Sequence, residues 1–169
     1  DLNTNASASF AGNFGNAPHY GADGAGSVSS VYTLGVKSAG VDSGLVDVAT
    51  HEAVLLRVNG SGIEGYTATT NQTVFTVAVD SAGQVTLDQL RALQHPDASN
   101  PDDSVSPNAD AITLTRTDTI TDRDGDTNTG SASINIGNAL SFRDDGPSIT
   151  VSGTVPADDA LEVDESDLN

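Results

Sequence analysis

The sequence predicts an all-β protein, an Ig-like antiparallel β-sandwich with one short helix near residues 87–94. The first observation behind this prediction is that apolar residues alternate with small or polar ones in most patterned segments, as in strands with one buried face. The second is that Gly, Asn and Asp interrupt these segments at short intervals, as in residues 59–62 and 80–83. Such clusters favour tight turns between neighbouring antiparallel strands.

The alternation places the expected strands in chain order. In residues 32–36, Tyr, Leu and Val alternate with small or polar residues, and later segments repeat this pattern. Residues 74–79 are apolar on both faces, which is typical of a central strand in a sandwich. Residues 1–30 and 94–110 are the least patterned stretches of the chain. The expected strands are 32–36, 54–58, 74–79, 111–121, 129–137 and 149–155.

One helix is expected to interrupt the strands. Thr86 followed by Gln89 fits a capping box, in which side chains satisfy the free backbone amides at the start of a helix. The three leucines within residues 87–93 would then lie on one helix face, and Pro96 would end the helix after barely two turns.

We expect one module over residues 1–157, followed by an acidic linker over residues 158–169 that enters the next repeat. The tripeptide Asp-Leu-Asn occurs at residues 1–3 and again at residues 167–169, which we interpret as the register of tandem repeats. Coincidence in a chain rich in Asp and Asn is the alternative. Because the chain begins with Asp1 rather than Met, we also expect it to be part of a longer protein.

Acidic residues dominate the charge, because the formal net charge is −18 and 20 of the 24 acidic residues are Asp. Nucleic acids and anionic membranes would repel such a chain, and neither is expected as a partner. No apolar segment approaches membrane-spanning length, and we expect no membrane insertion. The chain has no Cys, and a secreted domain without disulfides needs another means of stabilisation, such as a bound metal. Asp side chains in turns suit hard cations, which predicts Ca²⁺ as the cofactor.

The strongest expected Ca²⁺ site runs from Asp122 to Asn128. Asp122, Asp124, Asp126 and Asn128 supply oxygen side chains at alternate positions, as in the first half of an EF-hand loop. Gly125 lets the backbone wrap until these oxygens converge. The distal Glu of an EF-hand is absent, and the other ligands would have to come from another loop or from the backbone. An ordinary Asp-Gly hairpin turn is the alternative, and it is compatible with a metal site.

Two further loops carry acids that suit Ca²⁺. Asp97, Asp102 and Asp103 lie in a loop containing two prolines, which is either a Ca²⁺ site or an ordinary surface loop. Asp144 and Asp145 lie where the module is expected to end. They either chelate an ion between adjacent modules or belong to a solvated acidic linker.

Asp23 and a row of threonines are weaker candidates for binding residues. Asp23 lies in the Gly-rich segment 21–26 and is more typical of a turn residue than of a ligand. Threonines occupy every second position of residues 113–121, which places them in one row on one face of a strand. An array of such rows could order water or bind ice or polysaccharide, whereas a single row is typical of a solvated strand.

No residue pattern predicts an enzyme. His51 and Glu52 are adjacent, while His19 and His95 stand alone, and these spacings are not diagnostic of metal or nucleophile activation. Two carboxylates are enough for glycoside hydrolysis. Aromatic residues make up only 4% of the chain, however, and leave little surface on which a sugar could stack. We therefore expect no enzymatic activity.

Several segments, taken in order, form a recognisable set. They are residues 10–15 (FAGNFG), 22–25 (ADGA), 76–90 (TVAVDSAGQVTLDQL), 95–97 (HPD), 100–103 (NPDD), 121–126 (TDRDGD) and 142–148 (FRDDGPS). This set resembles the type I secretion target repeats, which occur in tandem within giant RTX adhesins of Gram-negative bacteria. The resemblance covers most of the chain, and the ordered set is more specific than any single segment.

The resemblance implies export by type I secretion, an extracellular location at the cell surface, and Ca²⁺-stabilised β modules that act as spacers in cell adhesion and biofilms. We therefore expect a structural extender that projects a distal ligand-binding region from the cell. As a module it would be monomeric and would contact neighbouring repeats of the same chain. The alternative is a ligand-binding module for carbohydrate, ice or protein. A flat Thr face spanning several strands, or an exposed aromatic cluster, would favour that alternative.

Overall fold

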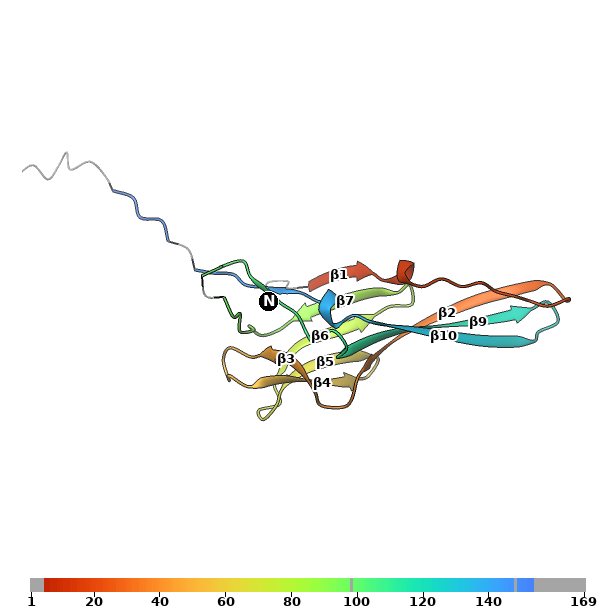
Figure 1. Cartoon of the computed structure of the whole chain (residues 1–169), viewed down its shortest axis with the longest axis horizontal. Helices are drawn as coiled ribbons and strands as arrows, with labels where there is room; N and C mark the ends of the chain where they lie inside the picture. The colour runs from red at the N-terminus through yellow and green to blue at the C-terminus, as the bar shows by residue number, and fades with distance from the viewer. Residues whose placement is uncertain (1–4, 98, 148, 154–169) are drawn as a thin grey trace, which may run out of the picture.

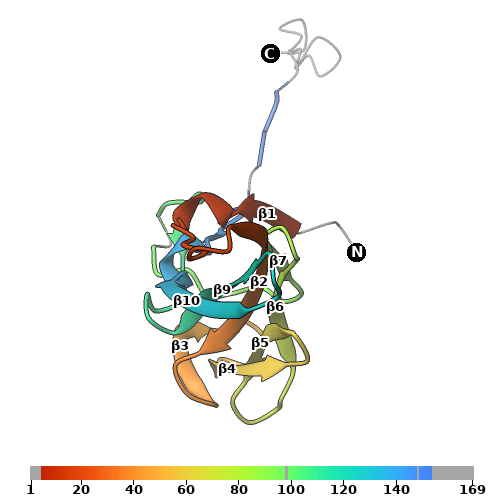
Figure 2. The ribbon, with the colours of Figure 1, turned by 90° about the vertical axis from the view of Figure 1, so that its right-hand side faces the viewer.

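Antiparallel strands in two facing layers make up the protein, which confirms the predicted all-β sandwich (Figure 1 and Figure 2). The computed structural model describes residues 5–97, 99–147 and 149–153. In chain order the elements are β1 (Asn5–Ser9), the 3₁₀ helix η1 (Ala11–Asn13), β2 (Ala25–Val36), β3 (Val41–Val46), β4 (Ala53–Asn59), β5 (Gly62–Thr67), β6 (Thr73–Val79), β7 (Gln84–Gln89), β8 (Ser104–Val105), β9 (Ile112–Asp122), β10 (Thr127–Asn135), the 3₁₀ helix η2 (Gly137–Ala139) and β11 (Phe142–Arg143).

The first layer is a six-stranded sheet with the order β1-β7-β6-β5-β4-β3. In this order β6 is an interior strand, as the apolar residues 74–79 predict. The second layer contains a three-stranded sheet, β10-β9-β2, and a two-stranded sheet, β11-β8. The predicted strands 111–121 and 129–137 correspond to β9 and β10, and they form the expected hairpin.

The core lies between the layers and consists mainly of Val, Leu and Ile. Two aromatic rings meet at its centre, because the ring centroids of Phe75 in β6 and Phe142 in β11 are 5.0 Å apart. Phe142 is only 2% exposed, although its strand is just two residues long. The buried hydrophobic residues are Leu34, Leu45, Val54, Leu56, Ile63, Val74, Phe75, Val77, Val85, Leu87, Leu93, Ala111, Ile112, Leu114, Ile136, Leu140 and Phe142.

The three-stranded sheet extends beyond the six-stranded sheet and gives the molecule an elongated form (Figure 1). Within the core, Leu34 of β2 and Leu114 of β9 are buried. Toward the tip of the sheet the inner face opens, and Val28 of β2 is 41% exposed. The tip, where β9 turns into β10, therefore gains little stability from the apolar core.

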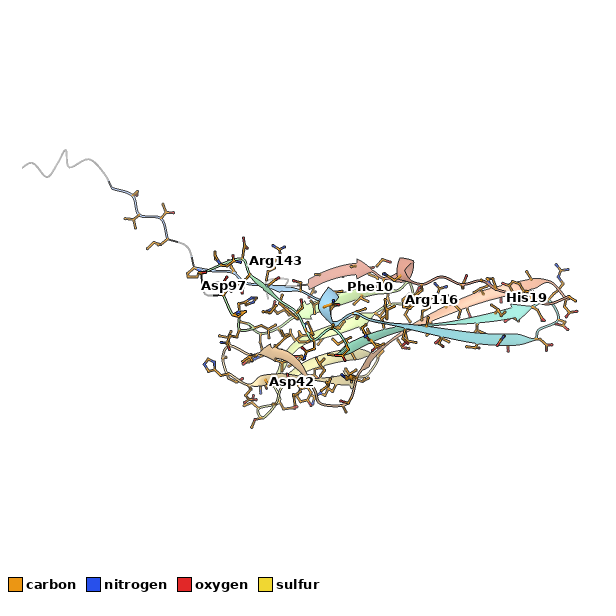
Figure 3. The ribbon with its side chains drawn as sticks, in the orientation of Figure 1. Phe10, His19, Asp42, Asp97, Arg116 and Arg143 are labelled. Atoms are coloured by element: carbon orange, nitrogen blue, oxygen red, sulfur yellow. The ribbon has the colours of Figure 1, made fainter. Side chains whose placement is uncertain are left out.

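Polar contacts attach the segment before β2 to the inner face of this extension. The Nε of Arg116 donates to Oδ1 of Asp118 at 2.7 Å, and its Nη1 donates to the carbonyl of Phe14 at 3.3 Å. Asp118 also accepts a hydrogen bond from Asn16 at 3.0 Å. Arg116 is the main reason why the pKa of Asp118 is lowered to about 2. Figure 3 places Arg116 part-way along the extension and His19 near its tip.

A buried ion pair joins the residues after β3 to the residues after β7. The carboxylate of Asp47, with a side chain only 1% exposed, accepts hydrogen bonds from Nε and Nη2 of Arg91 at 2.8 and 3.0 Å. It also accepts from the backbone and side chain of Thr50. The hydrogen bond from Arg91 is the largest cause that lowers the pKa of Asp47 to about 2, against the opposing effect of burial.

The predicted helix near residues 87–94 is wrong. Residues 84–89 form strand β7 between β1 and β6, and Val85 and Leu87 both point into the core, being 2% and 7% exposed. Leu90, which the helix would have buried, is 48% exposed. Two neighbouring strands satisfy the main-chain groups of β7, whereas a helix of two turns is marginal without strong packing.

Other expectations also differ from the structure. Residues 149–153 form no strand, and the rest of the strand predicted for 149–155, like the expected linker at 158–169, lies outside the described residues. The weakly patterned stretch 1–30 contains β1 and the first half of β2, and the stretch 94–110 contains β8. No helix among the described residues is long and apolar enough to cross a membrane.

Candidate metal centre

The turn between β9 and β10 is built around the side chain of Asp122. Its Oδ1 accepts hydrogen bonds from the backbone N–H of Gly125 at 3.0 Å and of Asp126 at 2.8 Å. The backbone N–H of Asp122 donates to the carbonyl of Asp126 at 3.0 Å and closes the turn. Gly125 has a φ of +105°, which a residue with a side chain rarely adopts. The predicted Asp-Gly hairpin turn is therefore confirmed.

A second loop reaches this turn because β2 begins beside the end of β9. The backbone N–H of Arg123 donates to the carbonyl of Gly24 at 3.2 Å. The register of the two strands shifts between Ala25 and Ser27. At the shift, a Cβ on Gly26 would lie 2.4 Å from the carbonyl oxygen of Thr121. Only glycine allows this close approach, which brings the loop before β2 against the hairpin turn.

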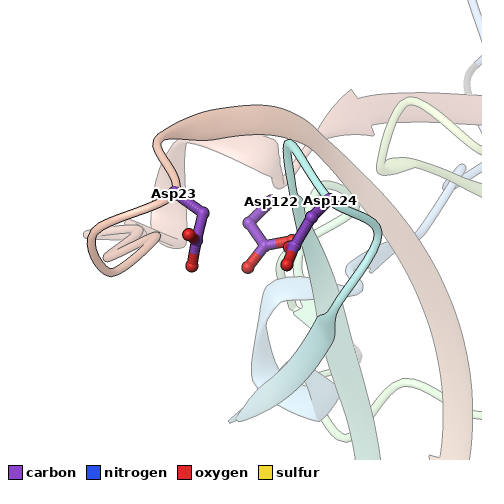
Figure 4. A group of neighbouring side chains, drawn as sticks. All are labelled: Asp23, Asp122 and Asp124. Carbon is purple, nitrogen blue, oxygen red and sulfur yellow. The ribbon is translucent and has the colours of Figure 1, made fainter.

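The result is a group of three carboxylates, from Asp23, Asp122 and Asp124. Each offers an oxygen, and these oxygens all lie within 4.8 Å of one another (Figure 4). Asp122 is half-buried, while Asp23 and Asp124 are exposed. We call this group the acidic triad. In the part of the chain that the structure describes, it is the one group of three or more acidic, His or Cys side chains close enough to share a metal ion.

Two members of the triad, Asp122 and Asp124, shift each other's pKa. A hydrogen bond with Asp122, together with the negative charge of that carboxylate, raises the pKa of Asp124. The same hydrogen bond, with help from backbone N–H groups of the turn, lowers the pKa of Asp122. The two neighbouring carboxylates therefore repel each other when both are ionised. A divalent cation bound between them would offset this repulsion.

The donor chemistry of the triad fits a hard cation. Carboxylate oxygens are preferred ligands of Ca²⁺, which takes six to eight oxygens and tolerates irregular geometry. The three side chains come from two loops, and water or backbone oxygens would have to complete the shell. A cation at the triad would cross-link the start of β2 to the turn between β9 and β10, where the apolar core does not reach.

Asp126 and Asn128, predicted as ligands beside Asp122 and Asp124, do not join the triad. With Asp122 they line a shallow cavity of about 110 Å³ that also contacts His19 and Tyr20. Asp126 contributes to the turn through its backbone. Of the four residues predicted in this turn, the structure thus brings Asp122 and Asp124 together. It also places Asp23 beside them, although the sequence made Asp23 a weaker candidate.

Residues 1–137 match a family model described as a domain of unknown function (DUF5801). The chain belongs to the DUF5801 family. No curated protein and no solved structure matches the chain. The matched region of this DUF5801 domain contains the whole acidic triad and all strands from β1 to β10, whereas β11 lies beyond it.

The other predicted ligands lie at the opposite end of the molecule, where Figure 3 labels Asp97 and Arg143. The backbone N–H of Asp97 donates to Oδ2 of Asp103 at 3.2 Å, and that of Asp144 donates to the carbonyl of Asp103 at 2.9 Å. The two acidic loops are thus adjacent. Nδ1 of His95 also lies 3.0 Å from Oδ1 of Asp103, without hydrogen-bond geometry.

Local turns occupy several carboxylates of this second region. Oδ1 of Asp97 accepts hydrogen bonds from the side chain and backbone of Ser99, which lower the pKa of Asp97. Oδ1 of Asp144 accepts from the backbone N–H of Asp145 at 3.0 Å. Within the described residues, Asp97, Asp102, Asp103, Asp144 and Asp145 form no group comparable to the triad. Their binding of Ca²⁺ stays a prediction.

The threonine row of residues 113–121 belongs to a wider hydroxyl face that the sequence alone did not reveal. Directly opposite residues of paired strands share a face, and β9 pairs with β2 on one side and β10 on the other. Side-chain hydrogen bonds link β9 to β10 across this face, as between Thr117 and Ser131 at 2.9 Å. Across β2, β9 and β10 the rows are Ser27-Thr121-Thr127, Ser29-Thr119-Thr129, Val31-Thr117-Ser131 and Thr33-Thr115-Ser133.

Proposed function

We propose that this DUF5801 domain is a Ca²⁺-stabilised spacer module of a large secreted adhesin. It acts as a mechanical extender between a bacterial cell surface and a distal ligand-binding region. The observation that carries the proposal is the convergence of Asp23, Asp122 and Asp124 from two loops at one tip of an elongated β-sandwich. A net charge of −18 gives the chain a further reason to bind cations, because self-repulsion destabilises a compact acidic protein.

Ca²⁺ stabilises the module by binding the folded state alone. The triad forms only when β2 pairs with β9, because Asp23 lies far from Asp122 and Asp124 in the sequence. The binding free energy of the ion therefore adds to the free energy of unfolding. Cytosolic Ca²⁺ is low and extracellular Ca²⁺ is high. The chain would stay loosely folded before export and become rigid outside the cell.

The triad can be tested directly with Tb³⁺, an ion that replaces Ca²⁺ at oxygen sites and emits light when a nearby tyrosine is excited. The chain has no Trp and three Tyr, and Tyr20 shares a cavity with Asp122. We expect sensitised emission that added Ca²⁺ displaces. Asp124→Asn should abolish this emission and Tyr20→Phe should weaken it, while Tyr32→Phe serves as the matched control. No emission, or emission that survives Asp124→Asn, would contradict Ca²⁺ binding at the triad.

The spacer role is tested on two copies of the chain joined in tandem, by small-angle X-ray scattering. With Ca²⁺ we expect an extended, rigid pair with a well-defined maximum dimension. In chelator the distribution of dimensions should broaden. A compact pair, or a pair whose scattering is the same with and without Ca²⁺, would count against an extender stiffened by the ion.

The hydroxyl face supports a second candidate function, a ligand-binding module for ice or polysaccharide. Its rows span three strands, carry no charged side chain and include Val31, which is 58% exposed. Ice-affinity partitioning and polysaccharide pull-down of wild type and Thr117→Lys test this candidate, with Thr69→Lys, on an exposed loop, as the control. Retention that Thr117→Lys abolishes and Thr69→Lys preserves would favour the second function. If the wild type is retained in neither assay, the second function is ruled out and the spacer role remains.

A further inference from the structure

The segment that leaves the body after β11 has the pattern of a strand without a partner. The start of this segment is tied to the body by the backbone N–H of Gly146, which donates to the carbonyl of Pro101 at 3.3 Å. Beyond this point Ile149 and Val151 are 88% and 86% exposed, the highest values among the large hydrophobic residues described. They alternate with Thr150 and Ser152, and the segment leads away from the body (Figure 1).

Strand β1 offers a sheet edge to which such a strand could pair. It is an edge strand of the six-stranded sheet, and one row of its main-chain groups pairs with no strand among the described residues. Ala6 pairs with Leu87 and Ala8 pairs with Val85, and these alanines therefore face the same side as the buried residues of β7. Ala6 and Ala8 are nevertheless exposed, because the opposite layer leaves this corner of the sandwich incompletely covered.

The uncovered corner is an apolar groove of about 200 Å³. It lies between β1 and β7 on one side and the residues around η2 on the other. Seven of its nine lining residues are apolar: Ala6, Ala8, Phe10, Val85, Leu87, Ala139 and Leu140. An exposed apolar groove beside a free sheet edge is the arrangement that accepts an added strand.

We propose that residues 149–153 of a second copy of this module add as a strand to the free edge of β1 and cover the groove. Ile149 and Val151 are two residues apart, as are Ala6 and Ala8, and this shared period lets both large side chains enter the groove on one face. Residues 5–9 and 149–153 carry no charge. In a chain with a net charge of −18, such segments allow two copies to meet with little repulsion.

The donor belongs to another copy because Gly146 fixes the exit segment of the same copy near Pro101, and from there it leads away from the body. The contact is heterologous, since donor and acceptor are different surfaces, and it joins copies head to tail. A neighbouring repeat of the proposed adhesin would be such a copy, but the contact itself requires only a second module.

The test uses the full chain carrying Ile149→Asp and Val151→Asp, labelled with ¹⁵N, so that its own exit segment does not compete. A synthetic peptide of residues 147–155 is the probe. We expect amide shift changes confined to residues 5–10, 85–87 and 139–141. A peptide with the same two Asp substitutions should bind at least about tenfold more weakly, as should the wild-type peptide to the labelled chain carrying Ala8→Arg.

Shift changes at the edges formed by β3 or β10 would overturn the proposal, as would equal binding of the Asp-substituted peptide. Sedimentation of the unlabelled proteins gives an independent readout. The wild-type chain should associate with rising concentration, and the chain with Ile149→Asp and Val151→Asp should stay monomeric. Association unaffected by these substitutions would contradict strand addition. Tb³⁺ binding at the triad should be the same in both proteins, which separates this proposal from the Ca²⁺ proposal.

Discussion

A carboxylate oxygen of Asp23 lies within 4.8 Å of one from Asp122, although the two residues belong to loops far apart in the sequence. The pairing of β2 with β9 produces this contact, and Asp124 completes the triad from the same turn as Asp122. Three carboxylates in such proximity repel one another unless protons or a cation intervene. The pairing of β2 with β9 therefore creates the group of carboxylates on which the proposed function depends.

Gly26→Ala should separate the two loops of the triad. The added Cβ would lie 2.4 Å from the carbonyl oxygen of Thr121 and 2.5 Å from that of Asp122, and β2 would have to move away from β9. We expect a loss of about 1–3 kcal/mol in the free energy of unfolding and weaker Ca²⁺ binding, measured by urea denaturation and calorimetry. Gly130→Ala, in the same sheet with no atom within 4 Å of the new Cβ, is the control. Equal effects of the two variants would refute this explanation.

The affinity for Ca²⁺ should fall as the pH falls. In the metal-free protein the pKa of Asp124 is raised by Asp122, and its proton favours the folded state at low pH. This contribution is lost as the pH rises through the raised pKa. Ca²⁺ must displace that proton, and binding should strengthen over the same interval. Calorimetry in buffers of different ionisation enthalpy should detect proton release, and Asp124→Asn should remove it. Proton release that persists in this variant would place the linkage elsewhere.

The ion pair between Asp47 and Arg91 should govern part of the stability in acid. The pKa of Asp47 is lowered to about 2 from 3.8, which corresponds to about 2 kcal/mol at neutral pH. This contribution is complete above the unfolded value and is lost as the pH falls from about 4 toward about 2. Urea denaturation at several pH values should show Asp47→Asn less stable than wild type at pH 7, with a difference that shrinks in this interval.

The control for that series is Asp110→Asn. Asp110 pairs with Lys37 at 2.5 Å, but both side chains are more than half exposed, and such pairs contribute little. We expect its effect on stability to be small at every pH. A difference between Asp47→Asn and wild type that did not change with pH would show that packing, rather than charge, gives Asp47 its role.

Phe142→Ala should destabilise the domain although Phe142 lies beyond the region that matches the family. Its ring packs against Phe75 in the core at a centroid distance of 5.0 Å, and loss of a buried Phe side chain costs about 3–5 kcal/mol. Ile149→Ala, at a position 88% exposed, should leave the isolated module unchanged. Thermal unfolding at low protein concentration compares the two. Similar midpoints for both variants would mean that β11 is not part of the cooperative fold.

Much of the fold could be predicted because local pattern and tertiary structure agree. Residues 74–79 and the hairpin of β9 and β10 alternate or cluster apolar residues as their positions in the sheets require. Strand β7 is the exception. Leucines spaced three residues apart fit one face of a helix, while the alternation of Val85 and Leu87 fits a strand equally well. Pairing with β1 and β6 decided the outcome, and partner strands distant in sequence are not visible in a local window.

The triad could be predicted only in part for the same reason. The oxygen side chains of Asp122 and Asp124 stand in one turn, and their spacing is visible in the sequence. Asp23 joins them through the register of β2 on β9, which depends on a stretch of Ala, Ser and Gly with weak periodicity. The hydroxyl face could not be predicted for the same reason. One row of threonines is visible in a short stretch of sequence, whereas the neighbouring rows on β2 and β10 are placed beside it only by strand pairing.

Thermal unfolding of the wild-type chain and of Asp124→Asn, in chelator and with added Ca²⁺ or Mg²⁺, tests the central claim most directly. At a Ca²⁺ concentration about 100-fold above the dissociation constant, binding adds about 2.7 kcal/mol, and the wild-type midpoint should rise by about 5–10 °C. Mg²⁺ should raise it far less, and Asp124→Asn should lose the Ca²⁺ effect. A wild-type midpoint that is the same in chelator and in Ca²⁺ would contradict the account.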